Sequence, residues 1–557
     1  MGADDRSRVA DGRQPVALGD SRPRGKGPPQ LAQTGIAARR AIKSAFRDGH
    51  SSGTKIVNIR PIIGLEIHVQ LATRTKMFCP CAVEFAAEPN SRVCPVCLGM
   101  PGTLPVMNRA AFELSVRAAL ALNCTIARFT KWDRKSYYYP DMPKNYQISQ
   151  YDLPLSSEGH FDVPKEDGAT RRVRIRRAHL EEDAGKNIHE GLPYTRVDLN
   201  RAGTPLLEIV TEPDLADAEE AYAFCVELQR LVQYLGISEA NMQKGQMRFE
   251  PNVNVAITEG GIEYRTPISE IKNLNSFRSV RDAIKYEIDR QVREWRTNHD
   301  YTLEKVGKLN FGWDMDRGVT EFQRGKEESH DYRYFPDPDL VPVTVKDSWI
   351  EQVRTELGEL PLARQQRFMR DFGMSAKDCE VILADRATGD LYDAAVAAGA
   401  EAKMLTKQFV GVWNHLASAK GVSIGRLGVT AARAAELAMA VSGGAVSATA
   451  ATQIAEEVVR NGTGAPSASE NVMDIARRLG VLQERDEGAT QKWVDEAFAA
   501  NPQAVADALG TNERKAKAAP GFLRGQVMKI SQGKADAKLV GDLIERKLGE
   551  LRAANSE

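Results

Sequence analysis

The sequence lacks the glycine-rich signatures with which many proteins bind nucleotides. Its 557 residues contain neither a Gly-x-x-x-x-Gly-Lys-Ser/Thr phosphate loop nor a Rossmann glycine run. No apolar run approaches the roughly 18 residues that a membrane-spanning helix needs. Net charge is also lacking, because 75 basic residues cancel 75 acidic ones. Any polyanionic partner must therefore be bound by local patches, and any use of ATP must rest on a less common architecture.

Cysteine is scarce, but its distribution is informative. Only seven cysteines occur, too few for a disulfide scaffold in so long a chain. Four of them form two close pairs, Cys79-Pro-Cys81 and Cys94-Pro-Val-Cys97. Four thiolates at this spacing fit a closed tetrahedral zinc site with a structural role. The alternative is four ordinary buried cysteines, or a vestigial site that has lost its metal. The remaining three cysteines are scattered and are predicted to be core residues.

Residues 64–70, Gly-Leu-Glu-Ile-His-Val-Gln, alternate apolar and polar side chains. This period of two predicts a half-buried strand whose second face carries Glu66 and His68. An acid and a histidine on one strand face indicate a site that binds a cation or transfers a proton. Matching carboxylates occur at Glu181 and Glu270, and we predict that these four residues form one acidic site. Magnesium prefers hard oxygen ligands and keeps several waters, so one to three carboxylates suffice.

The alternating arginines at 171–177 predict another strand, with Arg174 and Arg176 on one face. Such a face is either simply solvated or binds phosphates, and the sequence leaves both interpretations open. Residues 137–147 combine tyrosines and prolines with Lys144 and predict a rigid loop near a phosphate or an adenosine. We take Lys144, Arg174, Arg176 and Lys272 as the candidate cofactor-binding residues.

The remaining patterns predict an α+β fold with an antiparallel sheet followed by helical segments. Strand patterns occur up to about residue 345, and Ala-, Glu- and Arg-rich helical periodicity follows from about 350. A Lys/Ala-rich polar stretch at 511–520 indicates a second break. The predicted elements are strands at 194–199, 205–210, 247–257 and 262–268 and helices at 110–122, 216–235 and 280–296.

The first 58 residues differ from the rest of the chain. They contain eleven Lys or Arg against five Asp or Glu, and little apolar periodicity. We predict a largely disordered basic extension. A mitochondrial transit peptide is one alternative, but the acidic residues Asp4, Asp5 and Asp11 disfavour it. A basic arm that contacts nucleic acid is another, and a dispensable extension or a start codon placed too early is the third. The prediction for the whole chain is a cytoplasmic protein.

Several long sequence motifs resemble those of one known family, the B subunits of the tRNA-dependent amidotransferases (GatB, of the GatCAB complex). The resemblance covers residues 59–557. The motifs that carry it include Gly-Leu-Glu-Ile-His-Val-Gln at 64–70, Cys-Pro-Val-Cys-Leu-Gly-Met-Pro-Gly at 94–102, Tyr-Pro-Asp-Met-Pro-Lys-Asn-Tyr-Gln at 139–147, His-Leu-Glu-Glu-Asp-Ala-Gly-Lys at 179–186, Glu-Ile-Lys-Asn-Leu-Asn-Ser-Phe-Arg at 270–278 and Gly-Phe-Leu-Arg-Gly-Gln-Val-Met-Lys at 521–529.

The resemblance implies a domain order and a ligand set. It implies a cradle-shaped catalytic domain at 59–350, an all-α domain at 351–485 and a YqeY-like, tRNA-binding tail domain at 486–557. It places the family's magnesium ligands at Glu66, His68, Glu181 and Glu270 and its zinc knuckle at Cys79, Cys81, Cys94 and Cys97.

The resemblance also implies a two-step reaction. ATP phosphorylates the side-chain carboxylate of Glu or Asp mischarged on tRNA(Gln) or tRNA(Asn), and ammonia then displaces the phosphate. A separate amidase, the A subunit, releases the ammonia from glutamine, and a heterotrimer is completed by the small C subunit. The absence of a Ser- and Gly-rich amidase loop from this sequence agrees with a separate ammonia source. The alternative function is a zinc-stabilised tRNA-binding protein without catalysis, and a third is a stand-alone ligase that uses free ammonia.

Overall fold

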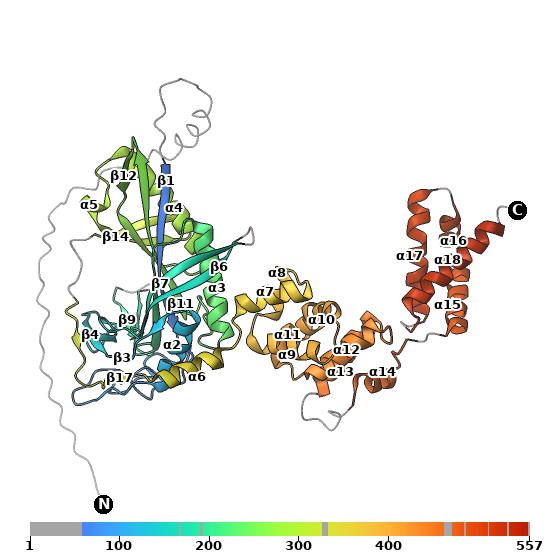
Figure 1. Ribbon diagram of the computed structural model, residues 1–557, viewed down its shortest axis with the longest axis horizontal. Helices are drawn as coiled ribbons and strands as arrows, with labels where there is room; N and C mark the ends of the chain where they lie inside the picture. Colours follow the sequence, from blue (N-terminus) through green and yellow to red (C-terminus); the bar gives the residue numbers. More distant parts are fainter. Residues whose placement is uncertain are drawn as a thin grey trace, which may run out of the picture. The chain divides into compact units, whose positions relative to one another are not determined.

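The computed structural model (Figure 1) describes residues 58–165, 169–189, 193–325, 332–461, 470–483, 486–510, 512–531 and 534–554. The predicted basic extension lies outside these residues, apart from Asn58, which begins the first strand. The predicted α+β class is confirmed, since a large sheet with flanking helices occupies the first part of the chain and helices alone the second. Within the described ranges, no helix is long and apolar enough to cross a membrane.

A ten-stranded sheet organises the first part. Its neighbouring strands are antiparallel except for one parallel pair, β13 and β14. In order, they are β15 (Val319–Arg324), β14 (Lys308–Asp314), β13 (Ile268–Lys272), β11 (Met247–Glu259), β1 (Asn58–Gln70), β10 (Pro205–Thr211), β7 (Thr170–Glu182), β6 (Ser156–Pro164) and β2 (Thr125–Ile126), with β12 (Ile262–Arg265) paired to β11.

Three smaller sheets accompany the large one. They are β16 (Phe335–Pro336), β4 (Asp133–Ser136) and β5 (Tyr146–Ser149) in one, β17 (Val343–Thr344) with β3 (Phe129–Thr130) in the second, and β8 (Lys186–Ile188) with β9 (Arg196–Asp198) in the third.

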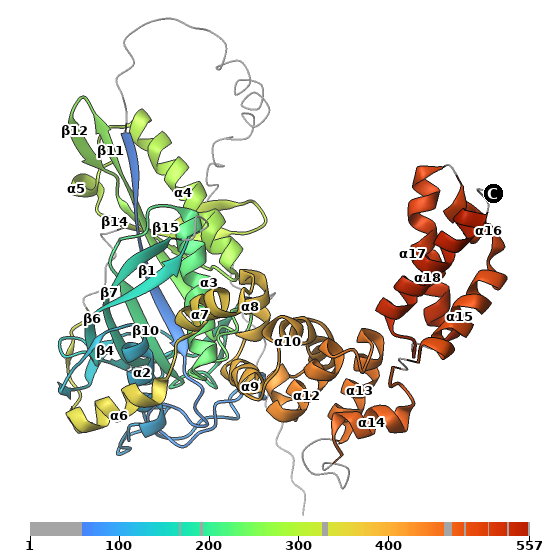
Figure 2. The same ribbon diagram turned by 45° about the vertical axis from the view of Figure 1, so that its right-hand side comes forward.

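The central strand β1 shows why the sheet has one apolar and one polar face. Leu65, Ile67 and Val69 are fully buried in the largest apolar cluster, whereas Glu66 and His68 between them face the other way. The apolar face is covered by α2 (Arg109–Ala121), α3 (Ala218–Tyr234) and α4 (Phe277–Thr297), as Figure 2 shows. The strand predicted from the alternation at 64–70 is confirmed.

A change of phase in two strands keeps the polar face continuous. Val173 and Ile175 of β7 are buried in the core, and so is Leu180, although its parity in the sequence is opposite. The pairing of β7 with β10 shifts by one residue at Arg176, and the facing residue Glu158 of β6 has a positive φ of 56°. An extra residue of this kind reverses which side chains face the core.

The predicted strand at 262–268 is divided in the structure. β12 ends at Arg265, and Ile268 begins β13. Thr266 between them is buried, and its backbone N–H and hydroxyl both bond to Val255 on β11. Pro267 has no N–H to donate to a sheet, so the chain leaves the hairpin here.

Two further helices complete the first part, α5 (Leu303–Val306) and α6 (Asp347–Leu357). Ile350, Val353 and Leu357 of α6 belong to the same apolar cluster as the sheet. The limit of this cluster therefore lies beyond the residue 350 that the sequence indicated. The predicted division into domains at 350 and 485 stays a prediction.

A second apolar cluster has members from Phe368 to Ala476, most of them on helices and the rest in the turns between them. The helical elements are α7 (Pro361–Phe372), α8 (Ala376–Ile382), α9 (Arg386–Ala397), α10 (Ala402–Gln408), the π-helical turn η2 (Phe409–Trp413), α11 (Asn414–Lys420), the 3₁₀ turn η3 (Ile424–Arg426), α12 (Ala431–Ser442), α13 (Ala448–Asn461) and α14 (Val472–Leu479).

A third cluster, with members from Val494 to Leu548, joins the last four helices, α15 (Glu487–Ala500), α16 (Pro502–Leu509), α17 (Glu513–Ile530) and α18 (Ala537–Ala554). The predicted break at 511–520 is wrong, because α17 runs through Pro520. A proline inside a helix costs about 3 kcal/mol. Burial of Ala519, Leu523 and Val527 along one face of α17 offsets that cost.

Candidate active site and candidate metal centre

The polar face of the large sheet brings together acidic and histidine side chains from three adjacent strands. On this face His68 of β1 lies opposite Glu208 of β10, and Glu208 lies opposite His179 of β7. The Nε2 atom of His68 is 3.3 Å from Glu181 Oε1, 3.6 Å from Glu208 Oε2 and 3.9 Å from Glu66 Oε1. The structure thus brings two of the predicted ligands, Glu66 and Glu181, close to a third, His68, while Glu208 belongs to both groups of candidate ligands.

Burial and close pairing shift the pKa values of the ionisable groups in this cluster. Burial raises the pKa of the Glu66 carboxyl to about 7, helped by Glu208, while His68 acts in the opposite direction. Burial alone would lower the pKa of His68, but hydrogen bonds with Glu181 and Glu208 raise it well above its usual value. The Nδ1 atoms of His68 and His179 are buried and have no hydrogen-bond partner among the residues that the structure describes.

The donor atoms fit a divalent cation. One carboxylate oxygen each from Glu66 and Glu208 and a ring nitrogen of His68 all lie within 4.8 Å of one another. A second set, His179, Glu181 and Glu208, meets the same limit. Carboxylate oxygens are the ligands that magnesium prefers, and water completes its shell.

The fourth predicted ligand, Glu270, has different partners. It lies on β13, two strands from β1, where its carboxylate pairs with Lys272 at 2.7 Å and with Lys308. Burial would raise the pKa of Glu270, but the two ammonium groups lower it to about 2. Its influence on Glu66 is electrostatic and raises the pKa of that carboxyl. The magnesium role of Glu270 stays a prediction.

The four predicted cofactor-binding residues all pair with carboxylates. Arg174 and Arg176 lie on the polar side of β7 and make bidentate hydrogen bonds to Asp214 and Glu212. Lys272 lies between Glu250 and Glu270. Lys144, in the loop between β4 and β5, pairs with the buried Glu182. Their predicted role with a nucleotide stays a prediction.

Three successive acids, Glu181, Glu182 and Asp183, lie at the end of β7 and just beyond it. Successive strand residues point to different sides, so Glu181, Glu182 and Asp183 do not share one environment. Glu181 contacts His68, Glu182 contacts Lys144, and Asp183 accepts a hydrogen bond of 2.8 Å from Arg248. Protein cations therefore already neutralise two of the three acids.

The sequence interpretation missed several residues of this face. Glu208 lay within a strand that was predicted correctly, and the single acid in Pro-Leu-Leu-Glu-Ile-Val was the available signal. Glu250 lies directly opposite Glu66. Lys135 of β4 is held charged near Glu181 and Glu208, whose charges raise its pKa against the effect of burial. The position of Lys135 beside the acidic cluster could not be predicted from a local sequence pattern, because β4 belongs to another sheet.

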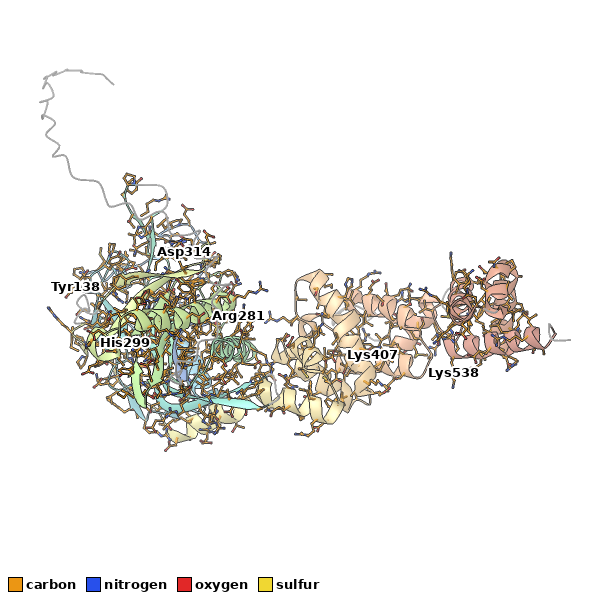
Figure 3. The ribbon with its side chains drawn as sticks, turned by 90° about the horizontal axis from the view of Figure 1, so that it is seen from above. Tyr138, Arg281, His299, Asp314, Lys407 and Lys538 are labelled. Atoms are coloured by element: carbon orange, nitrogen blue, oxygen red, sulfur yellow. The ribbon has the colours of Figure 1, made fainter. Side chains whose placement is uncertain are left out.

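Tyrosine side chains from two loops lie near Lys135. The Lys135 ammonium lies 4.7 Å from the ring centroid of Tyr332, and Tyr334 stacks on Tyr151 with centroids 4.1 Å apart. Tyr138 in the same loop system is 72% exposed and lies at the outer edge of the molecule in Figure 3. The loop predicted at 137–147 is too long by two residues, because β5 begins at Tyr146 and pairs with β4.

The four clustered cysteines converge as the spacing predicted. One sulfur atom each of Cys79, Cys81, Cys94 and Cys97 lies within 4.8 Å of the other three. Zinc at about 2.3 Å from four tetrahedral thiolates would place the sulfurs about 3.8 Å apart, so the residues fit the ion. A hydrogen bond with Cys79 lowers the pKa of Cys97 to about 4, although burial acts the other way.

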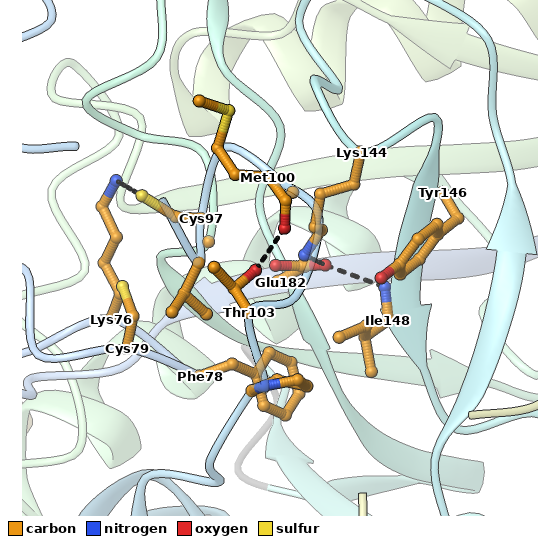
Figure 4. Close-up of a pocket in the computed structure, with 14 residues that line it drawn as sticks. Lys76, Phe78, Cys79, Cys97, Met100, Thr103, Lys144, Tyr146, Ile148 and Glu182 are labelled. Carbon is orange, nitrogen blue, oxygen red and sulfur yellow. Dashed lines mark hydrogen bonds and ion pairs between the residues drawn. The ribbon is translucent and has the colours of Figure 1, made fainter. Parts of the chain in front are cut away.

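A small cavity of about 60 Å³ lies beside the cysteines (Figure 4). Its walls include Lys76 and Cys97 on one side and the Lys144–Glu182 pair on the other. Glu182 also accepts a hydrogen bond of 2.9 Å from the backbone N–H of Ile148 on β5. The cysteine knuckle therefore packs against the residue that follows Glu181 in β7.

Comparison with known proteins defines the class of this fold and site. A family model described as the GatB/GatE catalytic domain matches residues 61–351, and one described as the GatB domain matches residues 390–548. Three curated relatives are named as the B subunit of aspartyl/glutamyl-tRNA(Asn/Gln) amidotransferase. The relative from Moorella thermoacetica is 44% identical, over 87% of this chain and 99% of its own length. The one from Rhodopirellula baltica is 43% identical, over 88% of this chain and 97% of its own length. The one from Geotalea daltonii is 43% identical, over 88% of this chain and 99% of its own length. The chain belongs to the GatB family.

Proposed function

We propose that this chain acts as the B subunit of a glutamine-dependent tRNA amidotransferase. The reaction is the ATP-dependent conversion of Glu-tRNA(Gln), Asp-tRNA(Asn) or both into the matching amide, which makes the protein a carbon–nitrogen ligase. Family membership supports this function. The observation that carries it is the meeting of Glu66, His68 and Glu181 with Glu208 on one sheet face. A protein that only bound tRNA would have no need for these buried acids together.

The chemistry explains why such a site is needed. A carboxylate is a poor electrophile, because its leaving group would resemble hydroxide. In the proposed first step, a side-chain carboxylate oxygen of the aminoacyl-tRNA attacks the γ-phosphorus of ATP and ADP leaves. In the second, ammonia attacks the acyl carbon and inorganic phosphate leaves. Both steps bring negative charges together, so electrostatic stabilisation is the main task of the protein.

The residues of the polar face divide this task. Glu66, Glu181 and Glu208 would hold Mg²⁺, which supplies positive charge between ATP and the acid, and His68 would join them in its unprotonated form. Lys272 and Lys308 are fixed by Glu270, and Lys135 by its acidic neighbours, so their ammonium groups need no rearrangement to meet phosphate oxygens. Preorganised charges of this kind cost little reorganisation during the reaction.

The proposed intermediate also requires partners. An acyl phosphate hydrolyses readily, so ammonia must arrive along a path sheltered from bulk water. We propose two partner proteins, an amidase (the A subunit) that releases ammonia from glutamine and the small C subunit. Together with this chain they form a heterotrimer in the cytoplasm. The four cysteines would hold a structural Zn²⁺ outside the reaction.

The experiment that tests this function combines the chain with its two candidate partners. We expect amidation of at least one of the two mischarged tRNAs when the chain, both partners, ATP and glutamine are all present. Omission of ATP should abolish the product, and omission of the amidase should abolish glutamine use but not ammonium use. Glutamine-dependent product from the chain alone would instead indicate a stand-alone ligase. No product under any condition would contradict the proposal.

A separate part of the proposal is that the last four helices bind tRNA, and a deletion tests it. Removal of residues 486–557 takes away one complete apolar cluster and leaves the other two intact. We expect tRNA affinity to fall at least about tenfold, or 1.4 kcal/mol, while ATP hydrolysis changes by less than about twofold. Filter binding and phosphate release measure the two quantities. A deletion of residues 1–57 serves as the control for loss of a basic segment, and unchanged tRNA affinity after loss of 486–557 would contradict the role.

A further inference from the structure

Lys76 is buried in an unusual environment. Its side chain has no exposed surface, and its ammonium nitrogen lies 3.7 Å from Cys97 Sγ and 3.3 Å from the backbone oxygen of Leu199. Among the residues that the structure describes, no carboxylate forms an ion pair with Lys76. A buried ammonium is unfavourable unless an anion balances it, and one carbonyl oxygen supplies only a dipole.

The group that can balance Lys76 is the cysteine cluster itself. Four thiolates around one Zn²⁺ carry a net charge of −2, and a neighbouring ammonium reduces this to −1. The ammonium lies 3.7 Å from the sulfur of Cys97, so it faces this negative charge directly. We propose that Lys76 is the outer-sphere cation of the four-cysteine metal centre and stabilises the bound metal through a charge-assisted N–H···S hydrogen bond to Cys97. Metal ligands are commonly held by outer partners of this kind.

The backbone around Lys76 supports this assignment. The Lys76 N–H donates to the backbone oxygen of Cys81 at 2.9 Å, so one residue bonds to the first cysteine pair through its backbone and to the second through its side chain. Gly203 packs against the stem, since a Cβ atom added there would lie 3.4 Å from Lys76 Cδ and 3.7 Å from Cys97 Cβ. The ammonium is therefore held in place from two sides.

The same cavity contains a natural comparison. Lys144 is also buried beside the cysteines, but its ammonium pairs with Glu182 and has its own anion. Figure 4 shows Lys76 directed at Cys97 and Lys144 directed at Glu182. If buried positive charge in this region merely supported the fold, the two lysines would be equivalent. If Lys76 acts through the thiolate, only Lys76 affects the metal.

The test measures metal binding on the full-length chain, without substrates. Lys76→Met keeps an unbranched side chain that is one atom shorter but removes the charge and the donor. We expect a 10- to 100-fold weaker zinc affinity in chelator competition. In the cobalt-substituted protein, the sulfur-to-cobalt charge-transfer band should move to lower energy, because a thiolate without a hydrogen bond is a stronger electron donor. Lys76→Arg should restore both quantities, and Lys144→Met should leave both at the wild-type value.

Each outcome decides the inference. Equal zinc affinity and an unchanged cobalt spectrum in Lys76→Met would overturn it, as would equal losses in Lys76→Met and Lys144→Met. If Lys76→Met does not fold, Lys76→Gln and Lys76→Arg give the same comparison, with weak binding expected only for the glutamine variant. A folded wild-type chain without zinc would also overturn it, and that result would leave the catalytic proposal standing, because the acidic cluster lies on a separate face.

Discussion

Replacement of Glu181 by glutamine is expected to lower the rate of ATP-dependent amidation at least about 100-fold, the scale on which loss of one preorganised electrostatic group acts. Glu181 is 3% exposed, and its carboxylate contacts His68 Nε2 at 3.3 Å. Glutamine has nearly the same shape but carries no charge for a cation. tRNA affinity should stay within about twofold, because that binding depends mainly on phosphate contacts elsewhere.

The measurement compares amidation and tRNA binding in the reconstituted complex. Glu263→Gln is the control, since Glu263 lies on the exposed hairpin strand β12 and pairs with Arg60 and Arg265. It makes the same chemical change away from the acidic face and should retain full activity. Glu208→Gln should resemble Glu181→Gln, because Glu208 contributes to both sets of candidate ligands. Full activity in Glu181→Gln would remove the proposed magnesium role.

Loss of the zinc centre is expected to have the largest effect on stability. Structural zinc contributes about 10 to 16 kcal/mol of apparent binding free energy in small domains, and that energy is available to the fold. The double variant Cys94→Ser/Cys97→Ser removes two of the four candidate ligands. We expect about one zinc per wild-type chain by elemental analysis and less than about a tenth of that in the variant, with a clearly lower midpoint of thermal unfolding.

A matched control uses cysteines outside the cluster. Cys225→Ser removes a buried thiol of α3 that has no metal partner, so stability should fall modestly and zinc content should not change. The comparison separates loss of a ligand from loss of a packed side chain. A wild-type chain that is well folded without metal would contradict the prediction, and the four cysteines would then be ordinary core residues.

The sequence predicted the long helices and several strands before residue 300 because hydrophobic period is a local property. The three helices expected before residue 300 occur within two or three residues of their predicted limits, and caps explain their starts. Asn108, Asp217 and Ser276 each accept a hydrogen bond from a backbone N–H three residues later. The break expected at 511–520 failed because a polar, proline-containing stretch was interpreted without its buried face.

The acidic site was only partly predictable. Glu66, His68 and Glu181 stood out because charged residues interrupt apolar alternation in their strands. The ion pair between Glu270 and Lys308 depends on the order of strands in the sheet, because Lys308 lies on β14, which pairs with β13 in parallel. No sequence period states which strands will be neighbours. Arg174 and Arg176 illustrate the same limit, because their acids come from the residues that follow β10.

The single extra residue at Arg176 makes β7 sensitive to length at one point. Upstream of it, odd-numbered side chains enter the core, and downstream of it the even-numbered ones do. A substitution at this point keeps the register, whereas a deletion there would turn Leu180 toward the polar face and Glu181 toward the apolar core.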